Sequence, residues 1–567
     1  MSENEHRPTG LSRREVLRTG AVAGAAAAFG GMAAVPASAA PAQGRPAGGR
    51  DGADLALVNG TIHTMDADNT VASTVLIRDG KILAVGSRAG EHGRRVVTVN
   101  LHGRTVVPGI IDNHNHIVLM GNRPGHHTPL ENAYSIADVQ QTYAERSAGI
   151  PAGAWITTIG GFHRNHLVPP DQPPRLPTLA ELDDAVPDNP VYISEAFSGP
   201  SATNSLGKAF FTGRGITVGD DGSIAGGFGA SPTGQATLAL RQTLLTFDER
   251  KRGAVDAVGY GLGLGVTTHL DQGAFQAANA PSDGAAHEDN YTMHLPFLAL
   301  HDEGGLSARL RINFLHMESD PATPGLVERL RNQFQFFGDD MVRTGGIGEF
   351  IAQGTGTTFA AAALRVAEAG WRAEVHSLSA TDFQAEIQAF EAANATSPIT
   401  DLRWVIAPVP FITEDYVDRF KALGGGLSLT GWRYLAGSPS GNGPPFRMIV
   451  DNGINTGMSS DGMQIAPMNP WLHMYYATTG LNARGVLING GQQITRHEVL
   501  RLYTGENGWF LREEDTLGSI EPGKFADLAV LNKDYFAVPD EELKQIRSVL
   551  TVVGGEIVHD TGEVDVR

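Results

Sequence analysis

The chain has 567 residues, enough to bury a large core and to form more than one structural unit. Its formal net charge of −19 argues against a nucleic-acid partner, which needs a basic surface. Because the chain has no cysteine, disulfides, a thiolate nucleophile and cysteine-ligated zinc are excluded, and any metal must sit on histidine and carboxylate ligands.

The N-terminus has the features of an export signal. The segment from Ser12 to Leu17, SRREVL, contains a twin-arginine motif, and an apolar run rich in alanine and glycine follows from Ala21 to Val35. This run is too short and too glycine-rich for a convincing membrane span. The small residues at 37–39 predict cleavage nearby. We therefore expect residues 1–40 to be a twin-arginine signal peptide and residues 41–52 a flexible leader. The mature protein would then lack a membrane span and be periplasmic, cell-wall-associated or extracellular.

Both ends of the remaining chain carry short strand patterns. The stretch from Val75 to Val85 reads as a hairpin with a tight turn at Asp79-Gly80. Further strand patterns lie at 54–62, 522–531 and 549–558. We expect residues 53–105 and 510–567 to join into one small β-sandwich, which leaves a single large domain between them.

That large domain begins with the stretch VVPGIIDNHNHIVLM, from Val106 to Met120. An apolar strand runs directly into His114 and His116. Side chains along a strand alternate faces with a period of two, so the two imidazoles project to the same side. Two imidazoles on one face at the end of a buried strand make half of a transition-metal site.

With the preceding Pro-Gly-Ile-Ile-Asp, this stretch resembles the metal-binding first strand of the amidohydrolase superfamily. The resemblance implies an α/β fold: a distorted (β/α)8 TIM barrel, here residues 106–509, flanked by a split β-sandwich. Alternating strand and helix patterns agree with a parallel barrel, and Phe383, Ile387 and Phe390 give one helix an apolar face. The eight candidate strands are 106–111, 265–270, 310–315, one starting near 341, 373–376, 402–407, 426–430 and 455–461.

The strand count requires a long insertion after the first strand, about residues 123–260. It has strand patterns of its own at 155–159 and 191–193, and we expect it to be ordered and to cover the barrel mouth. With this insertion the chain looks most like the YtcJ-like branch, amidohydrolase family 3, which includes N-substituted formamide deformylases.

Active sites of such barrels lie at the carboxyl ends of the strands. The resemblance carries over four metal ligands, His114, His116, His376 and Asp461. Taken alone, His376 is as compatible with a structural role, and Asp461 with a helix N-cap. Together they imply one divalent ion, zinc in the first place, with iron, manganese or nickel as alternatives.

The ligand set implies hydrolysis of a carbon–nitrogen bond, in an amide, formamide or related small molecule. The ion would activate a water and polarise the carbonyl. Asp461 would take the proton of the attacking water and pass it to the leaving nitrogen. The sequence is compatible with an oligomer and indicates neither a nucleic-acid partner nor a membrane span.

Two positions depart from the family pattern. Arg343 stands where relatives often place a metal-bridging lysine on the fourth strand, and Pro408 ends the sixth strand, where a histidine is expected. Glu349 is an alternative ligand, although a solvated or ion-paired state is the simpler expectation. Residues able to replace the missing histidine are His163, His166, His269 and His473. The competing hypothesis is a relative with altered or no catalysis that uses the pocket to bind a ligand.

Overall fold

The structure, a computed structural model, describes residues 54–86, 95–169, 171–196, 198–227, 229–273 and 293–567. The predicted signal peptide and leader lie outside these ranges. None of the helices within them combines the length and the apolarity that a bilayer crossing requires.

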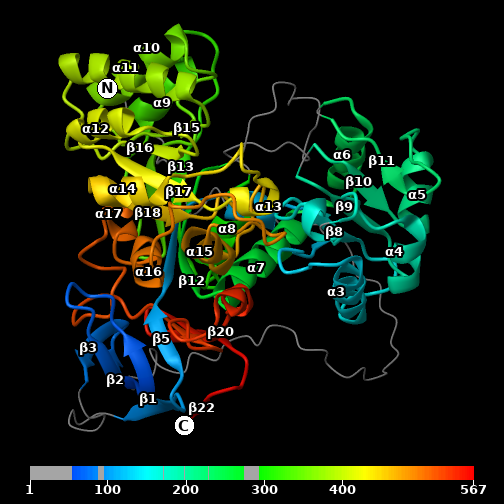
Figure 1. Ribbon diagram of the computed structural model, residues 1–567, viewed down its shortest axis with the longest axis horizontal. Coiled ribbons are helices and arrows are strands. Elements are labelled where there is room, and N and C mark those ends of the chain that lie inside the picture. Colours follow the sequence, from blue (N-terminus) through cyan, green and yellow to red (C-terminus); the bar gives the residue numbers. More distant parts are fainter. Residues whose placement is uncertain (1–53, 87–94, 170, 197, 228, 274–292) are drawn as a thin grey trace, which may run out of the picture. The chain divides into compact units, whose positions relative to one another are not determined.

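Eight parallel strands form the centre of the fold, in two four-stranded sheets ordered β14-β13-β12-β6 and β15-β16-β17-β18 (Figure 1). A parallel bridge between Ile347 and Ala373 links β14 to the start of β15. The amide of Asp461 donates to the carbonyl of His114 (2.9 Å) and links the end of β18 to β6. The predicted TIM-barrel-type fold is therefore confirmed. The strands are β6 (Ile110–Asn115), β12 (Val266–Asp271), β13 (Arg309–Phe314), β14 (Val342–Ile347), β15 (Glu374–Ser377), β16 (Val405–Pro408), β17 (Gly426–Thr430) and β18 (Asn455–Ser459).

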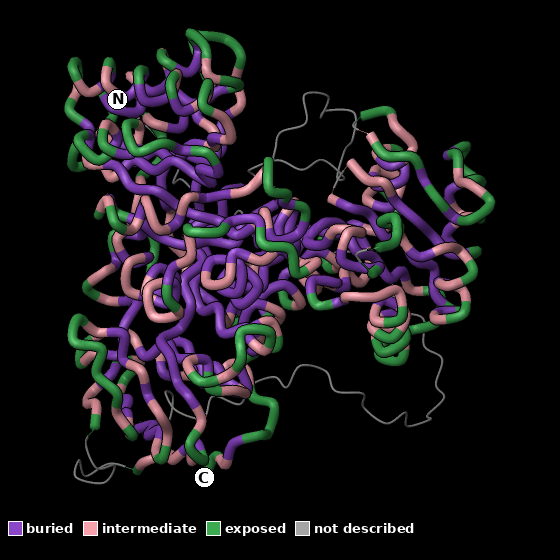
Figure 2. Tube along the Cα trace, viewed as in Figure 1, coloured by how far each residue is buried: buried purple, intermediate pink, exposed green. Residues whose placement is uncertain are grey.

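Helices connect successive strands and bury apolar faces against them. The predicted face of α11 is confirmed, since Phe383, Ile387 and Phe390 are each fully buried. Figure 2 shows the barrel strands as almost continuously buried. The principal helices of this region are α7 (Phe247–Gly263), α8 (Leu295–Asp302), α9 (Pro324–Asn332), α10 (Thr357–Glu368), α11 (Ala380–Thr396), α12 (Glu414–Ala422), α14 (Phe446–Asn452), α15 (Pro470–Thr479), α16 (Arg496–Tyr503) and α17 (Asn507–Leu511).

The first predicted strand is divided between two sheets. Its amino half is β5 (Thr105–Pro108), which pairs outside the barrel, and only β6 belongs to the barrel. Pro108 has no N–H with which to extend a ladder. A Cβ at Gly109 would lie only 2.2 Å from Oγ1 of Thr267, so glycine is required where the chain passes close to β12 on its way from β5 to β6. Proline and glycine together move the strand from one sheet to the next.

Strands from both chain ends form one nine-stranded sheet. Within it, β5 pairs in parallel with β1 (Asp54–His63) and antiparallel with β19 (Leu528–Leu531). The predicted hairpin turns at Asp79 and Gly80, both with positive φ (49° and 79°). The other strands are β2 (Val71–Arg78), β3 (Lys81–Val85), β4 (Val96–Asn100), β20 (Ser548–Val553), β21 (Glu556–Asp560) and β22 (Asp565–Val566).

The segment after β6 forms a five-stranded sheet of its own, in the order β11-β10-β9-β8-β7. It reaches the loop after β18, where the amide of Gly161 donates to the carbonyl of Gln464 (3.2 Å). The carboxylate of Glu131 accepts from the amides of Met468 and Asn469. These elements are β7 (His126–His127), α3 (Ile136–Ala148), β8 (Ile156–Ile159), α4 (Leu179–Ala185), β9 (Val191–Ser194), β10 (Ser201–Thr203), α5 (Ser205–Thr212), β11 (Ser223–Ile224) and α6 (Pro232–Leu244).

Candidate metal centre

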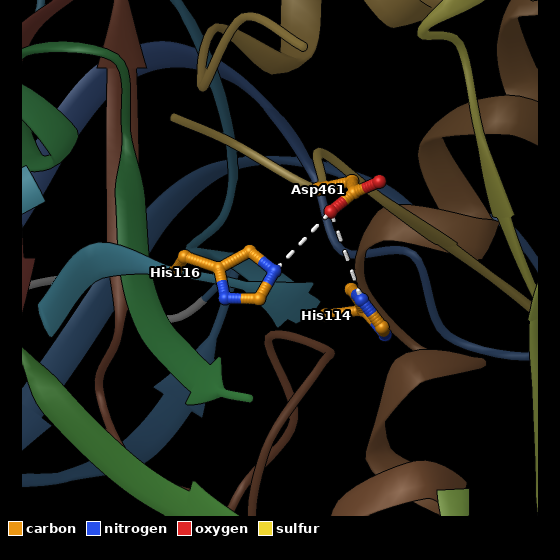
Figure 3. Close-up of side chains that lie close together, drawn as sticks. All are labelled: His114, His116 and Asp461. Atoms are coloured by element: carbon orange, nitrogen blue, oxygen red, sulfur yellow. Dashed lines mark ion pairs between the residues drawn. The ribbon is translucent and has the colours of Figure 1, made fainter. Parts of the chain in front are cut away.

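His114, His116 and Asp461 meet at the carboxyl end of the barrel. Each offers one ligand atom, and these atoms lie within 4.8 Å of one another. Oδ1 of Asp461 lies 3.8 Å from Nε2 of His114 and 3.4 Å from Nε2 of His116. Figure 3 shows this carboxylate oxygen directed at both imidazoles. All three residues are buried.

Each imidazole is oriented by a hydrogen-bond acceptor at its Nδ1 atom. Nδ1 of His114 lies 2.6 Å from Oε1 of Glu374, and Nδ1 of His116 lies 2.9 Å from the carbonyl of Gly273. An acceptor at Nδ1 places the proton there and leaves Nε2 as the ligand atom. Glu374 is itself fixed by the guanidinium of Arg372, which donates to Oε2 at 2.6 Å. Both Nε2 atoms therefore face Asp461.

Asp461 is positioned by contacts between β18 and β6. Asp112 accepts from the amide of Ser460 at 2.9 Å and also binds the Ser460 hydroxyl. The helix-cap alternative for Asp461 is wrong, because the next helix, α15, begins at Pro470 with Asn469 as its N-cap. Oδ2 of Asp461 is buried and has no hydrogen-bond partner among the described residues.

Glu349 and His376 adjoin this group. Nδ1 of His376 contacts Oε1 of Glu349, and Oε2 of Glu349 lies 3.5 Å from Nε2 of His116. His376 is thus linked to the three-residue group through the carboxylate of Glu349. Of the two states expected for Glu349, the solvated one is wrong, since the residue is 1% exposed, and the ion-paired one is confirmed, since the carboxylate lies between two histidines.

Arg343 does not occupy the position assigned to it. It is the second residue of β14, and its Nη1 lies 3.1 Å from Oε1 of Glu513, near the amino end of the strand. Glu349, two residues beyond β14, stands at the mouth instead. The segment after β14 therefore brings a carboxylate close to His116, and Arg343 lies away from the metal centre.

The histidines considered as replacements at Pro408 are engaged elsewhere. His473 accepts from the amide of Gly431 and donates to the carbonyl of Pro467, both at 2.8 Å. His269 lies against α7, where a Cβ at Gly261 would be 3.1 Å from its ring. His163 contacts Glu195 (2.7 Å), and Nε2 of His166 accepts from the amide of His163 (3.0 Å). None of the four belongs to the three-residue group.

The acids around the site favour positive charge there. Burial alone would lower the pKa of His116, but hydrogen bonding to Asp461 and the charges of Glu349 and Asp461 raise it to about 9. The pKa values of His114 and His376 are also raised, against burial, by Glu374 and Glu349 respectively. A cation suits such a pocket, and a bound metal replaces protons on these nitrogens.

Unsatisfied polar atoms gather at this end of the barrel. Buried atoms at the ends of six strands lack hydrogen-bond partners among the described residues. Buried polar groups normally have partners, so a concentration of exceptions indicates a site that binds something. The residues therefore fit a metal ion and a polar ligand. The atoms are Gln272 Nε2, His316 Nε2, Glu349 Oε2, Ser377 Oγ, Thr430 Oγ1 and Asp461 Oδ2.

Glu374 was not predicted, and Glu349 was predicted only as an alternative ligand. Glu374 had a usable signal, because it stands two residues before His376 and shares its strand face. Glu349 had none of comparable strength, since it lies beyond its strand and its histidine neighbours come from distant segments.

The chain is similar in sequence to one protein family over most of its length. The family model described as "Amidohydrolase family" matches residues 97–559. N-substituted formamide deformylase of Arthrobacter pascens is 25% identical over 569 residues, which cover 89% of this chain and 98% of that protein. Protein YtcJ of Bacillus subtilis (strain 168) is 23% identical over 539 residues, covering 88% and 98%.

Two solved structures share the fold. A metal-dependent hydrolase from Pyrococcus furiosus, described as uncharacterized, superposes with a TM-score of 0.56 at 19% identity and covers 85% of this chain and 100% of its own. Atrazine chlorohydrolase TrzN from Arthrobacter aurescens TC1, complexed with zinc, gives a TM-score of 0.51 at 17% identity, covering 89% and 95%.

Proposed function

This chain belongs to the amidohydrolase family and is a hydrolase of carbon–nitrogen bonds other than peptide bonds, and we propose that its substrate is a small amide or formamide cleaved at the His114–His116–Asp461 centre. The formamide class is favoured by the deformylase relative from Arthrobacter pascens, which matches almost the whole chain. The observation that carries the proposal is the convergence of the two Nε2 atoms on one carboxylate oxygen.

One divalent ion, zinc in the first place, fits ligands from His114, His116 and Asp461. His376 would complete the set from the side of Glu349. Iron, manganese or nickel would accept the same ligand types. Such an ion would act as a Lewis acid, lowering the pKa of a bound water toward neutrality and polarising a carbonyl.

Asp461 is the proposed proton carrier. Its Oδ2 is buried and free to accept, while Oδ1 faces the histidines. As the water oxygen bonds to the carbonyl carbon, its proton passes to this carboxylate and then to the leaving nitrogen as the C–N bond breaks. The products are a carboxylic acid and an amine.

Gln272 is the proposed donor to the developing oxyanion. Its Oε1 accepts from Nδ2 of Asn313 at 2.9 Å, which orients the amide. Its Nε2 is then left as a buried donor without a partner among the described residues, just beyond the end of β12. A fixed donor of this kind stabilises charge that develops in the transition state.

The test is a hydrolysis panel. Purified protein, stripped with a chelator and reloaded with zinc, is assayed against N-substituted formamides, simple amides, carbamates and lactones. We expect amine release from formamides or amides that is lost on stripping and restored by zinc. A tightly bound metal with no turnover of any C–N substrate would contradict the proposal and favour the ligand-binding alternative.

The domain division and the route to the substrate complete the proposal. We assign residues 53–105 and 510–567, together with the rest of β5 up to Pro108, to a composite β-sandwich, and residues 110–509 to the barrel with its insertion at about 123–260. Residues 1–40 are assigned to a twin-arginine signal, so that the enzyme meets its substrate outside the cytoplasm.

A further inference from the structure

The segment that follows β17 carries hydrogen-bond donors without partners. Oγ1 of Thr430, the indole Nε1 of Trp432 and Nε of Arg433 are buried atoms, and none has a hydrogen-bond partner among the described residues. The three residues lie at the carboxyl end of β17, where the short helix α13 (Arg433–Ala436) begins. Buried donors normally have partners, so three exceptions within four residues indicate a site for an acceptor. We call Thr430, Trp432 and Arg433 the β17 turn.

The β17 turn lies beside the metal centre. Thr430 pairs with Ser459 across the parallel strands β17 and β18. Neighbouring strands lie about 4.8 Å apart. Trp432 and Asp461 each follow two residues after this pair, so the two segments leave adjacent strands at the same level. A group bound at the turn is therefore within reach of a small molecule held at Asp461.

Thr430 belongs to the interior face of the barrel. It shares a strand face with Ser428, whose Oγ lies 2.6 Å from Oδ1 of Asn113 on β6. Strand β18 lies between β17 and β6 in the closed barrel, so side chains of these two strands meet only on the inside. The unpaired hydroxyl of Thr430 is therefore an interior donor at the metal end of its strand.

Arg433 has no carboxylate partner in the part of the chain that the structure describes. Its guanidinium carbon lies over the ring of Trp432, 3.9 Å from the ring centroid, and 5.1 Å from that of Phe411 in the loop after β16. Burial lowers the pKa of Arg433, and the charge interaction that opposes this shift comes from Tyr476, not from an acid. The residue is half-buried, and its buried Nε is unpaired. A cation held between two aromatic rings without a counter-ion is prepared to bind an anion.

We infer that the β17 turn binds a carboxylate of the substrate, so that the amide cleaved at the metal centre is of the N-formyl or N-acyl amino acid kind. The inference rests on the proposed hydrolysis of a small amide or formamide and narrows its substrate class. The planar guanidinium of Arg433 matches a carboxylate, and the Trp432 indole supplies a further donor. No lysine or second arginine affects the pKa of Arg433, and a single cation suits a monoanion better than a phosphate.

The experiment compares two substrates that differ only in a carboxylate, N-formylphenylalanine and N-formylphenethylamine, with the zinc-loaded protein. We expect the higher kcat/KM for N-formylphenylalanine. Arg433→Gln should lower this value about tenfold or more, through KM, since hydrogen bonds to charged groups typically contribute at least that much. The neutral substrate should be unaffected. Arg419→Gln is the matched control, because Arg419 also lies over an aromatic ring, that of Tyr416 (5.6 Å), but binds Glu391. It should change neither substrate.

Binding of the carboxylate probe hydrocinnamate, measured by calorimetry, separates this inference from the proposed function. We expect saturable binding to the zinc-loaded protein that is about tenfold or more weaker in Arg433→Gln and unchanged in Arg419→Gln. That pattern without turnover of any substrate would overturn the proposed function and leave the carboxylate site standing. Equal turnover of the two substrates, an equal loss on both in Arg433→Gln, or probe binding that persists in this variant, as binding through zinc alone would, overturns the inference. If Arg433→Gln unfolds, Arg433→Lys keeps the charge but not the fork and should still raise the KM of N-formylphenylalanine.

Discussion

Oε1 of Glu374 lies 2.6 Å from Nδ1 of His114, and both side chains are buried. The first residue of β15 thereby fixes the ring of a residue on β6, and Arg372 holds the carboxylate from the other side at 2.6 Å. The ligand face of His114 is set by a chain of contacts that crosses the barrel interior.

Replacing Glu374 by Gln should weaken metal binding by about 10–100-fold, as expected for an outer-shell partner of a metal-ligating histidine. A chelator-competition titration with zinc measures this, with circular dichroism to verify folding. Glu386→Gln is the control, because Glu386 is another fully buried glutamate, on α11. Equal zinc affinity in a folded Glu374→Gln variant would mean that His114 is not oriented by this carboxylate.

One tightly bound ion per chain is expected. Any second ion would find Glu349 and His376 but no polar side chain at Pro408, fewer than the three protein ligands usual at a catalytic zinc site. Elemental analysis should return one metal in the parent protein. The His116→Asn variant should lose this metal, because it lacks a direct ligand. Its metal affinity should fall by more than the ~100-fold that changes to outer-shell partners typically cause. His269→Asn, at another buried histidine, should keep it. Two metals per chain would contradict this account.

The barrel and its strands follow closely from the sequence, because each buried strand is a short apolar run between turn or helix signals. The His-x-His pair, His376 and Asp461 were identifiable at strand ends for the same reason. The exchange of Arg343 for Glu349 was not, because only the start of this strand was predicted, and Arg343 lies at that end while Glu349 lies two residues beyond the other. Counting residues from the start of a strand therefore fails to locate its mouth end.

The contacts between remote segments could not be predicted from the sequence either. The pairing of His376 with Glu349, and of Glu374 with His114, depends on which side chains face one another across the closed barrel. The division of the first strand could be foreseen better, since Pro108 and Gly109 interrupt it at the position where the chain changes sheets.

Glu131 predicts a pH dependence of stability. Burial raises its pKa to about 7 from 4.5, despite hydrogen bonds from Tyr260 and from the amides of Met468 and Asn469. The folded state thus keeps this proton when the unfolded chain has lost it. The contribution is fully present below pH 4.5 and is lost as pH rises through about 7.

Denaturant unfolding of the metal-free protein from pH 4 to pH 8 measures this effect against Glu131→Gln. The variant has no ionisable group at this position. Between pH 4 and pH 8 the free energy of unfolding of the parent should therefore fall by about 3 kcal/mol relative to that of the variant. A constant difference between the two proteins would show that Glu131 ionises normally in the fold.

We predict that export depends on the paired arginines of the N-terminal motif. Replacing Arg13 and Arg14 with Lys should leave full-length protein in the cytoplasm, because the twin-arginine route reads this pair. Cell fractionation and intact-mass measurement of the product check it. Normal processing of the double variant would assign the segment to another pathway or role.

Turnover of Asp461→Asn tests the central claim most directly. The substitution is nearly isosteric and should leave the protein folded, while the loss of a general base typically costs ~10²–10⁴-fold in rate. The control is Asp138→Asn, since Asp138 accepts from the amide of Tyr134 near the start of α3 and serves only local structure. The account predicts that zinc-loaded Asp461→Asn hydrolyses the best panel substrate at least ~10²-fold more slowly than the parent, with Asp138→Asn unchanged. Near-normal turnover in a folded, zinc-loaded Asp461→Asn protein would contradict it.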